Sequence, residues 1–280
     1  MIVDAHVHLF SRSVRGDRAA FFPEEPAFRL LYDSPKSRLV GVRETLEMMD
    51  EAGVDRAVVF GFPWRTAETF RRENDYILEA VARHPDRFTG LACFDPLHPA
   101  AAREAERCLD AGLAGAGELA FYQDGITAAG RAALEGVMAV CRERGRPVML
   151  HTNEPVGHRY PGKSPNTLAQ IYAVAQAFPD NTLILAHWGG GIFFYRLLRR
   201  EVREVLANVY FDTAASPFLY TPDIYPTAAT LAGADRILFG TDFPLLGPAR
   251  YFRDMETAGL PADQRAAMTG GNAARLFGLS

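Results

Sequence analysis

The first ten residues, MIVDAHVHLF, place three side chains that can bind metal in an otherwise apolar run. The β-branched and apolar neighbours predict a β-strand, in which every second side chain points to the same face. Asp4, His6 and His8 are therefore expected on one face, where two imidazoles can bind a single ion. An isolated H-x-H is equally compatible with one buried histidine and one at a strand end. The rest of the chain must decide between the two interpretations.

Apolar runs of strand length alternate with helical stretches along the whole sequence. Eight strands are predicted, at residues 2–8, 57–61, 87–93, 113–118, 147–151, 182–187, 208–212 and 236–242. Eight β-then-α units predict a parallel (β/α)8 TIM barrel with its active site at the C-terminal ends of the strands. The 280 residues, 48% of them hydrophobic, suit one such barrel as a single domain, residues 1–280.

Five further metal-competent residues end the predicted strands four to eight. They are Glu118, His151, His187, Asp212 and Asp242. Each one alone could be a simple helix cap. Together with His6 and His8 they bring seven metal-competent side chains to one mouth of the barrel, the arrangement that hydrolysis by a divalent metal requires.

Several motifs along the chain resemble those of the metal-dependent amidohydrolase superfamily. They are D-A-H-V-H, V-M-L-H-T, L-I-L-A-H-W-G-G, I-L-F-G-T-D-F-P and the terminal G-N-A-A-R-L-F-G-L. The chain is most similar to the amidohydrolase-related branch that includes aminocarboxymuconate-semialdehyde decarboxylase. The resemblance extends over the whole sequence.

The resemblance implies a ligand set for one divalent ion, expected to be Zn²⁺. The implied ligands are His6, His8, His151 and Asp242. His187 would be a nearby catalytic histidine. Asp212 has no ligand role in the resemblance and is expected to be a helix cap or a group that supports the ligands. Glu118 departs from the single-metal decarboxylases and falls where two-metal relatives such as TatD-type deoxyribonucleases place a bridging carboxylate. We therefore expect Glu118 to be a ligand as well, which leaves the number of ions at one or two.

The ligand set supports two reactions. In the first, a metal-activated water attacks an amide, lactone or ester bond of a small carboxylated substrate, and Asp242 transfers the proton. In the alternative, the same ion holds the carboxylate of an unsaturated or aromatic acid that loses CO₂ without oxidation. The sequence favours hydrolysis as its main prediction, although the ligands alone do not separate the two.

Two long connections are expected to cover the mouth and build the substrate site, or else to be solvated insertions. They are residues 11–40 and 152–165. Aromatic and cationic residues near the strand ends are expected to line the wall around a planar carboxylate. These are Trp64, Arg65, His158, Tyr160 and Trp188.

Charge and composition argue against other functional classes. The net charge of -4 gives no basic surface for nucleic acid or an anionic membrane, which disfavours a TatD-type nuclease. A non-catalytic binding barrel would have little reason to bring seven ligands together. The expected partner is a small molecule, and a homo-oligomer is left open.

The expected location is the cytoplasm. Cys93, Cys108 and Cys141 are widely spaced, so they are expected to be free thiols. The first predicted strand begins at residue 2, which leaves no room for a signal peptide. No apolar run approaches the roughly 20 residues of a membrane span.

Overall fold

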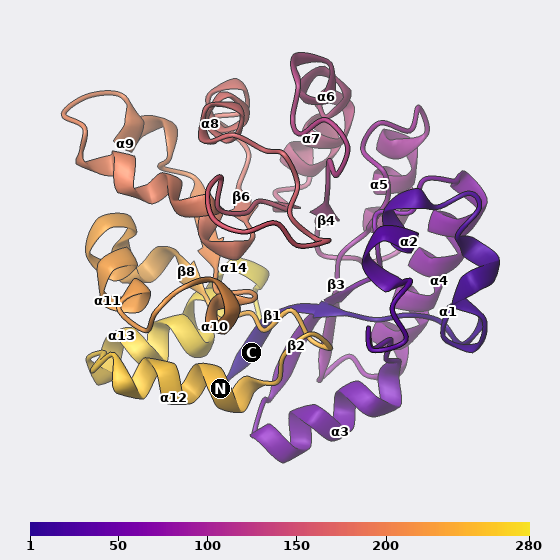
Figure 1. Cartoon of the computed structure of the whole chain (residues 1–280), viewed down its shortest axis with the longest axis horizontal. Coiled ribbons are helices and arrows are strands. Elements are labelled where there is room, and N and C mark those ends of the chain that lie inside the picture. The colour runs from indigo at the N-terminus through magenta and orange to yellow at the C-terminus, as the bar shows by residue number, and fades with distance from the viewer.

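Eight short parallel strands form the centre of the structure, a computed structural model that describes residues 1–280 (Figure 1). Their bounds are β1 Val3–His8, β2 Arg56–Phe60, β3 Phe88–Gly90, β4 Ala116–Leu119, β5 Val148–Leu150, β6 Leu183–Leu185, β7 Val209–Asp212 and β8 Ile237–Leu238. Each corresponds to one of the eight predicted strands, and most are shorter.

Backbone hydrogen bonds close the strands into a ring. The order is β1-β2-β3 in one sheet and β4-β5-β6-β7-β8 in the other. Parallel bridges join the sheets at Ala92 with Ala116 and at Val7 with Phe243. At the second junction the Ala5 amide donates to the Phe239 carbonyl at 2.7 Å. The predicted (β/α)8 barrel is confirmed.

Helices surround the ring of strands (Figure 1). They are α1 Arg12–Gly16, α2 Pro26–Tyr32, α3 Val42–Ala52, α4 Ala67–Arg83, α5 Ala101–Asp110, α6 Ala128–Ala133, α7 Glu135–Glu143, α8 Leu168–Ala177, α9 Val202–Val205, α10 Ser216–Leu219, α11 Ile224–Ala228, α12 Pro248–Thr257, α13 Ala262–Ala266 and α14 Asn272–Phe277. Short 3₁₀ or π segments cover Arg18–Phe21, His187–Leu197, Ala229–Gly233, Ala234–Arg236 and Ala267–Gly271. No helix combines the length and the apolar character that crossing a bilayer would require.

Strand β1 departs from strict alternation. Its register against β2 shifts between Asp4 and Val7. Val3 and Ala5 pack into the small core inside the barrel, whereas Val7 packs into the outer core between strands and helices. The expectation that Asp4 shares a face with His6 and His8 is therefore wrong, because the shift changes which residues face inward. The Asp4 carboxylate instead accepts the backbone N–H of Thr241 at 2.9 Å.

Three successive glycines in the segment after β6 adopt the left-handed backbone conformation that most other residues avoid. The φ angles of Trp188, Gly189, Gly190 and Gly191 are 63°, 62°, 62° and 87°, all in the left-handed region. A Cβ built on Gly190 would lie 2.4 Å from the backbone oxygen of Asn153, whereas one on Gly191 would meet nothing within 4 Å. The close approach packs this segment against the chain that follows β5.

We expect Gly190→Ala to destabilise the protein more than the matched change Gly191→Ala. Both substitutions incur the left-handed cost of about 1–2 kcal/mol, and only Gly190→Ala adds a clash with backbone, about 1–3 kcal/mol more. Urea unfolding of the two variants measures the difference. Equal losses of unfolding free energy would contradict the tight packing described here.

Candidate active site

Four histidines and two carboxylates converge at the C-terminal end of the barrel. His6 and His8 lie on β1 and Glu118 on β4, while His151, His187 and Asp242 follow β5, β6 and β8. Their side chains are between 0 and 16% exposed, and Asp242 is the most accessible. Three groups of these side chains have ligand atoms within 4.8 Å of one another: His6 with His8 and Glu118, His6 with His187 and Asp242, and Glu118 with His151 and His187.

One nitrogen of each histidine is fixed by an oxygen outside the cluster. His8 Nδ1 lies 2.9 Å from the Gly61 carbonyl, His151 Nε2 lies 2.9 Å from that of Gly162, and His187 Nδ1 lies 3.0 Å from that of Ala214. A carbonyl oxygen only accepts, so each of these nitrogens carries the proton and donates it. In the neutral ring, the other nitrogen presents a lone pair to the centre of the cluster.

His6 follows the same rule with a carboxylate. Its Nδ1 donates to Asp212 Oδ2 at 2.8 Å, and its Nε2 is buried with no hydrogen-bond partner. Carboxylate oxygens that orient metal-binding histidines in this way are a common feature of metal sites.

The inner nitrogens face carboxylate oxygens across short distances. Asp242 Oδ1 lies 3.3 Å from His8 Nε2 and 3.7 Å from His6 Nε2. Lone pairs of nitrogen and oxygen repel at this range unless a proton or a metal cation lies between them, and burying an uncompensated carboxylate is costly. The residues present thus fit a divalent metal ion, for which imidazole and carboxylate are ordinary ligands.

The pKa shifts show how strongly the cluster attracts positive charge. Burial opposes the charged form of His6, but the negative charges of Asp212 and Glu118 outweigh it and raise its pKa to about 10. Burial also opposes charging of His187, yet the hydrogen bond and charge of Glu118 raise its pKa to about 9. Burial would raise the pKa of Glu118, but the neighbouring charges of His151 and His6 hold it well below its usual value. The carboxylates therefore stay ionised and ready to bind a cation.

Asp212 organises two parts of the cluster by supporting other residues, and it belongs to none of the groups of possible metal ligands. Besides orienting the His6 ring, it accepts the backbone N–H of His187 at 2.8 Å and that of Ala214 at 3.0 Å. The side chain is fully buried at the end of β7. Its position at a strand end was the only signal in the sequence.

Replacement of Asp212 with Asn should weaken metal binding while leaving every direct contact atom in place. An amide accepts the His6 proton less well, and losses of this kind amount to about 10–100-fold in affinity. Isothermal titration with Mn²⁺ on folded variant and wild-type protein measures the effect. An unchanged dissociation constant would show that Asp212 does not act through His6.

A cavity of about 560 Å³ opens onto the cluster and is walled partly by both long loops. The first loop contributes Leu31, Tyr32, Lys36, Ser37 and Arg38, and the second contributes His158, Tyr160, Pro161 and Gly162. At its inner end the cavity reaches His8, Glu118, His151, His187 and Asp242. The structure thus joins the metal-competent cluster to a space large enough for a small molecule.

Two of the five expected wall residues, His158 and Tyr160, line this cavity. The other three lie elsewhere. Trp64 is fully buried against Phe28, with ring centres 4.6 Å apart. Trp188 is also fully buried and donates its indole N–H to Ser216. The Arg65 side chain is exposed and does not line the cavity.

Several aromatic wall residues were not predicted. They are Tyr32, Phe62, Tyr122 and Phe218. Phe62 and Tyr122 follow β2 and β4 closely, so their distance from a strand end could have identified them. Tyr32 ends α2 within a loop whose path depends on packing that the sequence does not display.

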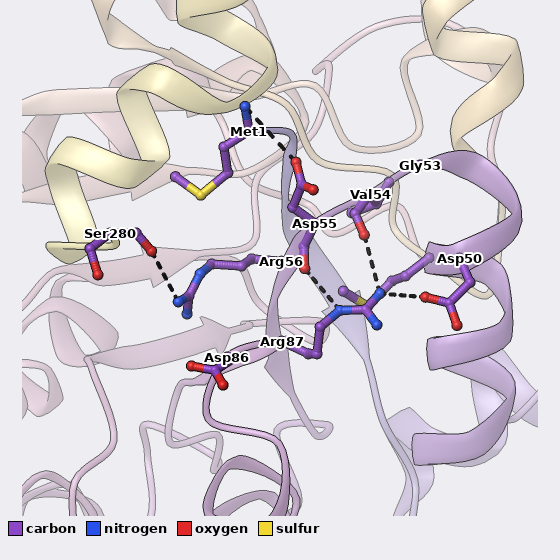
Figure 2. A pocket seen from close by; sticks show the side chains of 10 residues that line it. Met1, Asp50, Gly53, Val54, Asp55, Arg56, Asp86, Arg87 and Ser280 are labelled. Atoms are coloured by element: carbon purple, nitrogen blue, oxygen red, sulfur yellow. Dashed lines mark hydrogen bonds and ion pairs between the residues drawn. The ribbon is translucent and has the colours of Figure 1, made fainter.

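A larger and more open depression lies at the opposite end of the barrel and does not carry the chemistry (Figure 2). Its volume is about 800 Å³. Arg87 there donates to Asp50 at 2.7 Å and to the backbone oxygen of Asp55 at 2.9 Å. The Arg87 guanidinium and the Asp50 carboxylate therefore neutralise each other near the N-terminal ends of β2 and β3. In TIM barrels this face contributes to stability, and the C-terminal face carries the active site.

A family model described as Amidohydrolase matches residues 3–279. The chain belongs to this family. Among curated proteins, this amidohydrolase is 25% identical to gamma-resorcylate decarboxylase of Polaromonas sp. strain JS666, with 98% of this chain and 97% of the relative covered. It is 28% identical to gamma-resorcylate decarboxylase of Rhizobium radiobacter, with 81% and 83% covered.

Solved structures share the fold of the amidohydrolase. The 5-carboxyvanillate decarboxylase of Sphingomonas paucimobilis aligns with a TM-score of 0.77 at 22% identity, covering 100% of this chain and 99% of that one. The dihydroxybenzoic acid decarboxylase of Polaromonas sp. JS666, with bound manganese and the inhibitor 2-nitroresorcinol, aligns with a TM-score of 0.71 at 24% identity, covering 99% and 97%. The resemblance inferred from the motifs is confirmed.

These comparisons correct the main functional prediction. The amidohydrolase is an enzyme of the expected superfamily with a divalent-metal site, but its curated relatives are decarboxylases. Hydrolysis of an amide, lactone or ester bond was therefore the wrong choice between the two reactions. The error has a physical reason. Both reactions use the same types of metal ligand, and they differ in the side chains that the cavity places around the substrate.

Proposed function

We propose that this amidohydrolase is a metal-dependent, non-oxidative decarboxylase of aromatic acids that carry a hydroxyl group next to the carboxylate. One observation carries the proposal: the cavity that ends on Asp242 and the histidines has five aromatic side chains in its walls, those of Tyr32, Phe62, Tyr122, Tyr160 and Phe218. Such walls suit a flat ring. The curated relatives named above support the same substrate class.

In this proposal His6, His8 and Asp242 hold the divalent ion. When bound, the ion supplies positive charge that attracts the carboxylate and the neighbouring oxygen of the substrate. Two imidazoles and a carboxylate accept either Mn²⁺ or Zn²⁺. Manganese, the ion in the Polaromonas decarboxylase structure, is the first to test.

Asp242 is the residue that we assign to proton transfer. It lines the cavity, and its side chain is 16% exposed, more than any other member of the cluster. The contacts with His6 and His8 use only Oδ1, which leaves Oδ2 for a proton. Asp242, ionised in the free site, would first accept on Oδ2 the proton of the substrate's neighbouring hydroxyl and then give it to the ring carbon that bears the carboxylate. The bond from that carbon to the carboxylate then breaks, its electron pair restores the aromatic ring, and CO₂ leaves.

Two cations at the cavity wall would guide an anionic substrate inward. Lys36 and Arg38 both line the cavity, and neither forms an ion pair. Their charges are therefore available to an incoming carboxylate. Glu154, the acid of the second loop, is paired with Lys163 at 2.7 Å and so does not compete for these two cations.

The proposal is tested by CO₂ release from a panel of acids. Protein loaded with Mn²⁺ should convert 2,6-dihydroxybenzoate or another 2-hydroxybenzoate, and 4-hydroxybenzoate, which lacks the neighbouring hydroxyl, should be inert. Chelator-treated protein is the control. Failure of metal-loaded, folded protein to release CO₂ from any 2-hydroxybenzoate would overturn the proposal.

A further inference from the structure

The tip of the second loop, residues 154–163, contains no helix or strand. Its one backbone–backbone hydrogen bond runs from the Lys163 N–H to the Tyr160 carbonyl at 3.0 Å. The base of the loop is held separately. There the buried side chain of Asn153 accepts the Ser164 N–H at 2.9 Å and donates to the Ser164 carbonyl at 3.1 Å. The conformation of the tip therefore depends on contacts that its side chains make.

The Lys163 ammonium lies at the centre of these contacts. It donates to Glu154 Oε1 at 2.7 Å, to the His158 carbonyl at 3.1 Å and to the Val156 carbonyl. An ammonium group carries three protons, so each proton has an acceptor within the same loop. The side chains of Lys163 and Glu154 are only 11% and 15% exposed. Lys163 thus joins the end of the tip to its beginning and to two carbonyls of the segment between.

Glu154 extends this network to the cavity wall. Its Oε1 accepts from Lys163, and its Oε2 accepts the hydroxyl of Tyr160 at 2.9 Å. Burial and this hydrogen bond raise the pKa of Tyr160, so its hydroxyl stays protonated and donates. Tyr160 lines the cavity, whereas Glu154 does not. Because the hydroxyl is held by Glu154, the part of Tyr160 that faces a ligand is its ring.

The tip also contacts the metal-competent cluster. Gly162, the neighbour of Lys163, lines the cavity, and its carbonyl accepts the outer N–H of His151 at 2.9 Å. Lys163 and Glu154 belong to none of the groups of metal-competent residues. The ion pair therefore lies behind the wall, and the residues that it holds form part of the wall.

We propose that Glu154 and Lys163 are positioning residues that hold the ring of Tyr160 against the aromatic ring of the substrate. This role rests on the proposed function, which supplies the substrate, and it adds the residues that shape one wall of the cavity. Neither Glu154 nor Lys163 lines the cavity or touches Asp242. Loss of the ion pair should therefore raise KM and leave kcat nearly unchanged, because the groups that transfer the proton stay in place.

The first measurement follows the loop and needs no substrate. In Lys163→Met the largely buried Glu154 carboxylate loses its cation, which is costly. Arg159 is then the only trypsin site within residues 152–165. Full-length protein loaded with Mn²⁺ is treated with trypsin, and mass spectrometry follows the fragment 1–159. We expect it to form about 10-fold faster in Lys163→Met and in Glu154→Gln than in the wild type, since cleavage follows the population of the open loop.

The second measurement separates binding from chemistry. With the 2-hydroxybenzoate that the wild type converts, Lys163→Met should raise KM by about 3- to 10-fold, the value of one aromatic contact, and change kcat by less than about twofold. Tyr160→Ala should raise KM to a similar extent. The double variant, Lys163→Met with Tyr160→Ala, should have the KM of Tyr160→Ala alone, because Lys163 acts through that ring.

Arg144→Met is the matched control. Arg144 follows α7, donates to Asp110 at 2.9 and 3.1 Å and to Glu106 at 3.2 Å, and does not line the cavity. This variant also loses an ion pair, and it should keep the wild-type cleavage rate and KM. Circular dichroism and thermal melting establish that every variant is folded. Wild-type cleavage in folded Lys163→Met, faster cleavage with an unchanged KM, or additive effects in the double variant would each overturn the assignment.

Failure of this assignment differs from failure of the proposed function. A wild type that releases CO₂ and a Lys163→Met variant with the same KM refute the positioning role and keep the decarboxylase. If the wild type converts none of the acids, calorimetric titration with 2-nitroresorcinol, the inhibitor in the Polaromonas structure, replaces KM. Binding that is about 3- to 10-fold weaker in Lys163→Met then keeps the positioning role without the decarboxylase. Equal binding, or none to the wild type, refutes both.

Discussion

Replacement of Asp242 with Asn is expected to lower kcat by about 10²–10⁴-fold, the usual contribution of a positioned proton donor. Asparagine keeps the shape of the side chain and an oxygen that can still contact a metal ion, but its amide does not transfer a proton to carbon. CO₂ release at saturating Mn²⁺, measured together with manganese per chain, separates lost chemistry from lost metal. The rate should fall even when the variant carries its full complement of ion.

Asp254→Asn on the outer helix α12 is a suitable comparison, because that carboxylate does not line the cavity. It should retain wild-type kcat. A metal-loaded Asp242→Asn variant that turns over at the wild-type rate would remove Asp242 from the mechanism and direct attention to the other ionisable groups of the cavity.

The double replacement His6→Ala and His8→Ala should remove the divalent ion and decrease activity by about 10³-fold or more, since a catalytic ion supplies several kcal/mol of charge stabilisation. Nε2 of His6 and Nε2 of His8 both face Asp242 Oδ1. Removing the two imidazoles therefore removes two of the three ligands proposed for the ion. Manganese analysis of the purified, reloaded variant and a CO₂ assay give the two measurements.

His158→Ala provides a contrast within the same cavity, because His158 lines the wall but belongs to none of the groups of metal-competent residues. It should keep the wild-type metal content. If the double variant also kept it, the β1 histidines would not be ligands, and the assignment of the centre would fail.

The barrel and the metal-competent residues were predictable because both depend on local regularities. Apolar runs of strand length recur eight times, and the C-terminal ends of parallel strands meet at one mouth. Glu118, His151, His187 and Asp242 were found from their places at predicted strand ends, although Asp242 lies four positions beyond the last residue of β8. The fold of the family thus brings together residues that are widely separated in the sequence.

The features that the sequence analysis predicted wrongly depend on three-dimensional contacts. The register shift in β1 places the Asp4 side chain beside Thr241, and no residue type in this strand predicts that shift. Trp64 and Trp188 follow strands as expected wall residues do, yet each turns into a core of other aromatic rings. The choice between hydrolysis and decarboxylation failed for the same reason, since it depends on cavity walls that come from loops with no periodic pattern.

The junction where the first and last strands meet has a consequence for stability. Asp4 and Thr241 are 237 positions apart and hydrogen-bonded, and the Asp242 amide donates to the His6 carbonyl at 2.9 Å. An ion held by His6, His8 and Asp242 would bind β1 to the segment that follows β8 and so stabilise the junction between the first and last strands. Binding only to the closed barrel adds about 2.7 kcal/mol of stability when free ion is 100 times its dissociation constant. Removing the metal should therefore destabilise the junction of β1 and β8 more than the other strand pairs. Among the amide hydrogens of the barrel strands, those of Ala5, His8 and Asp242 should then be the first to exchange with solvent deuterium.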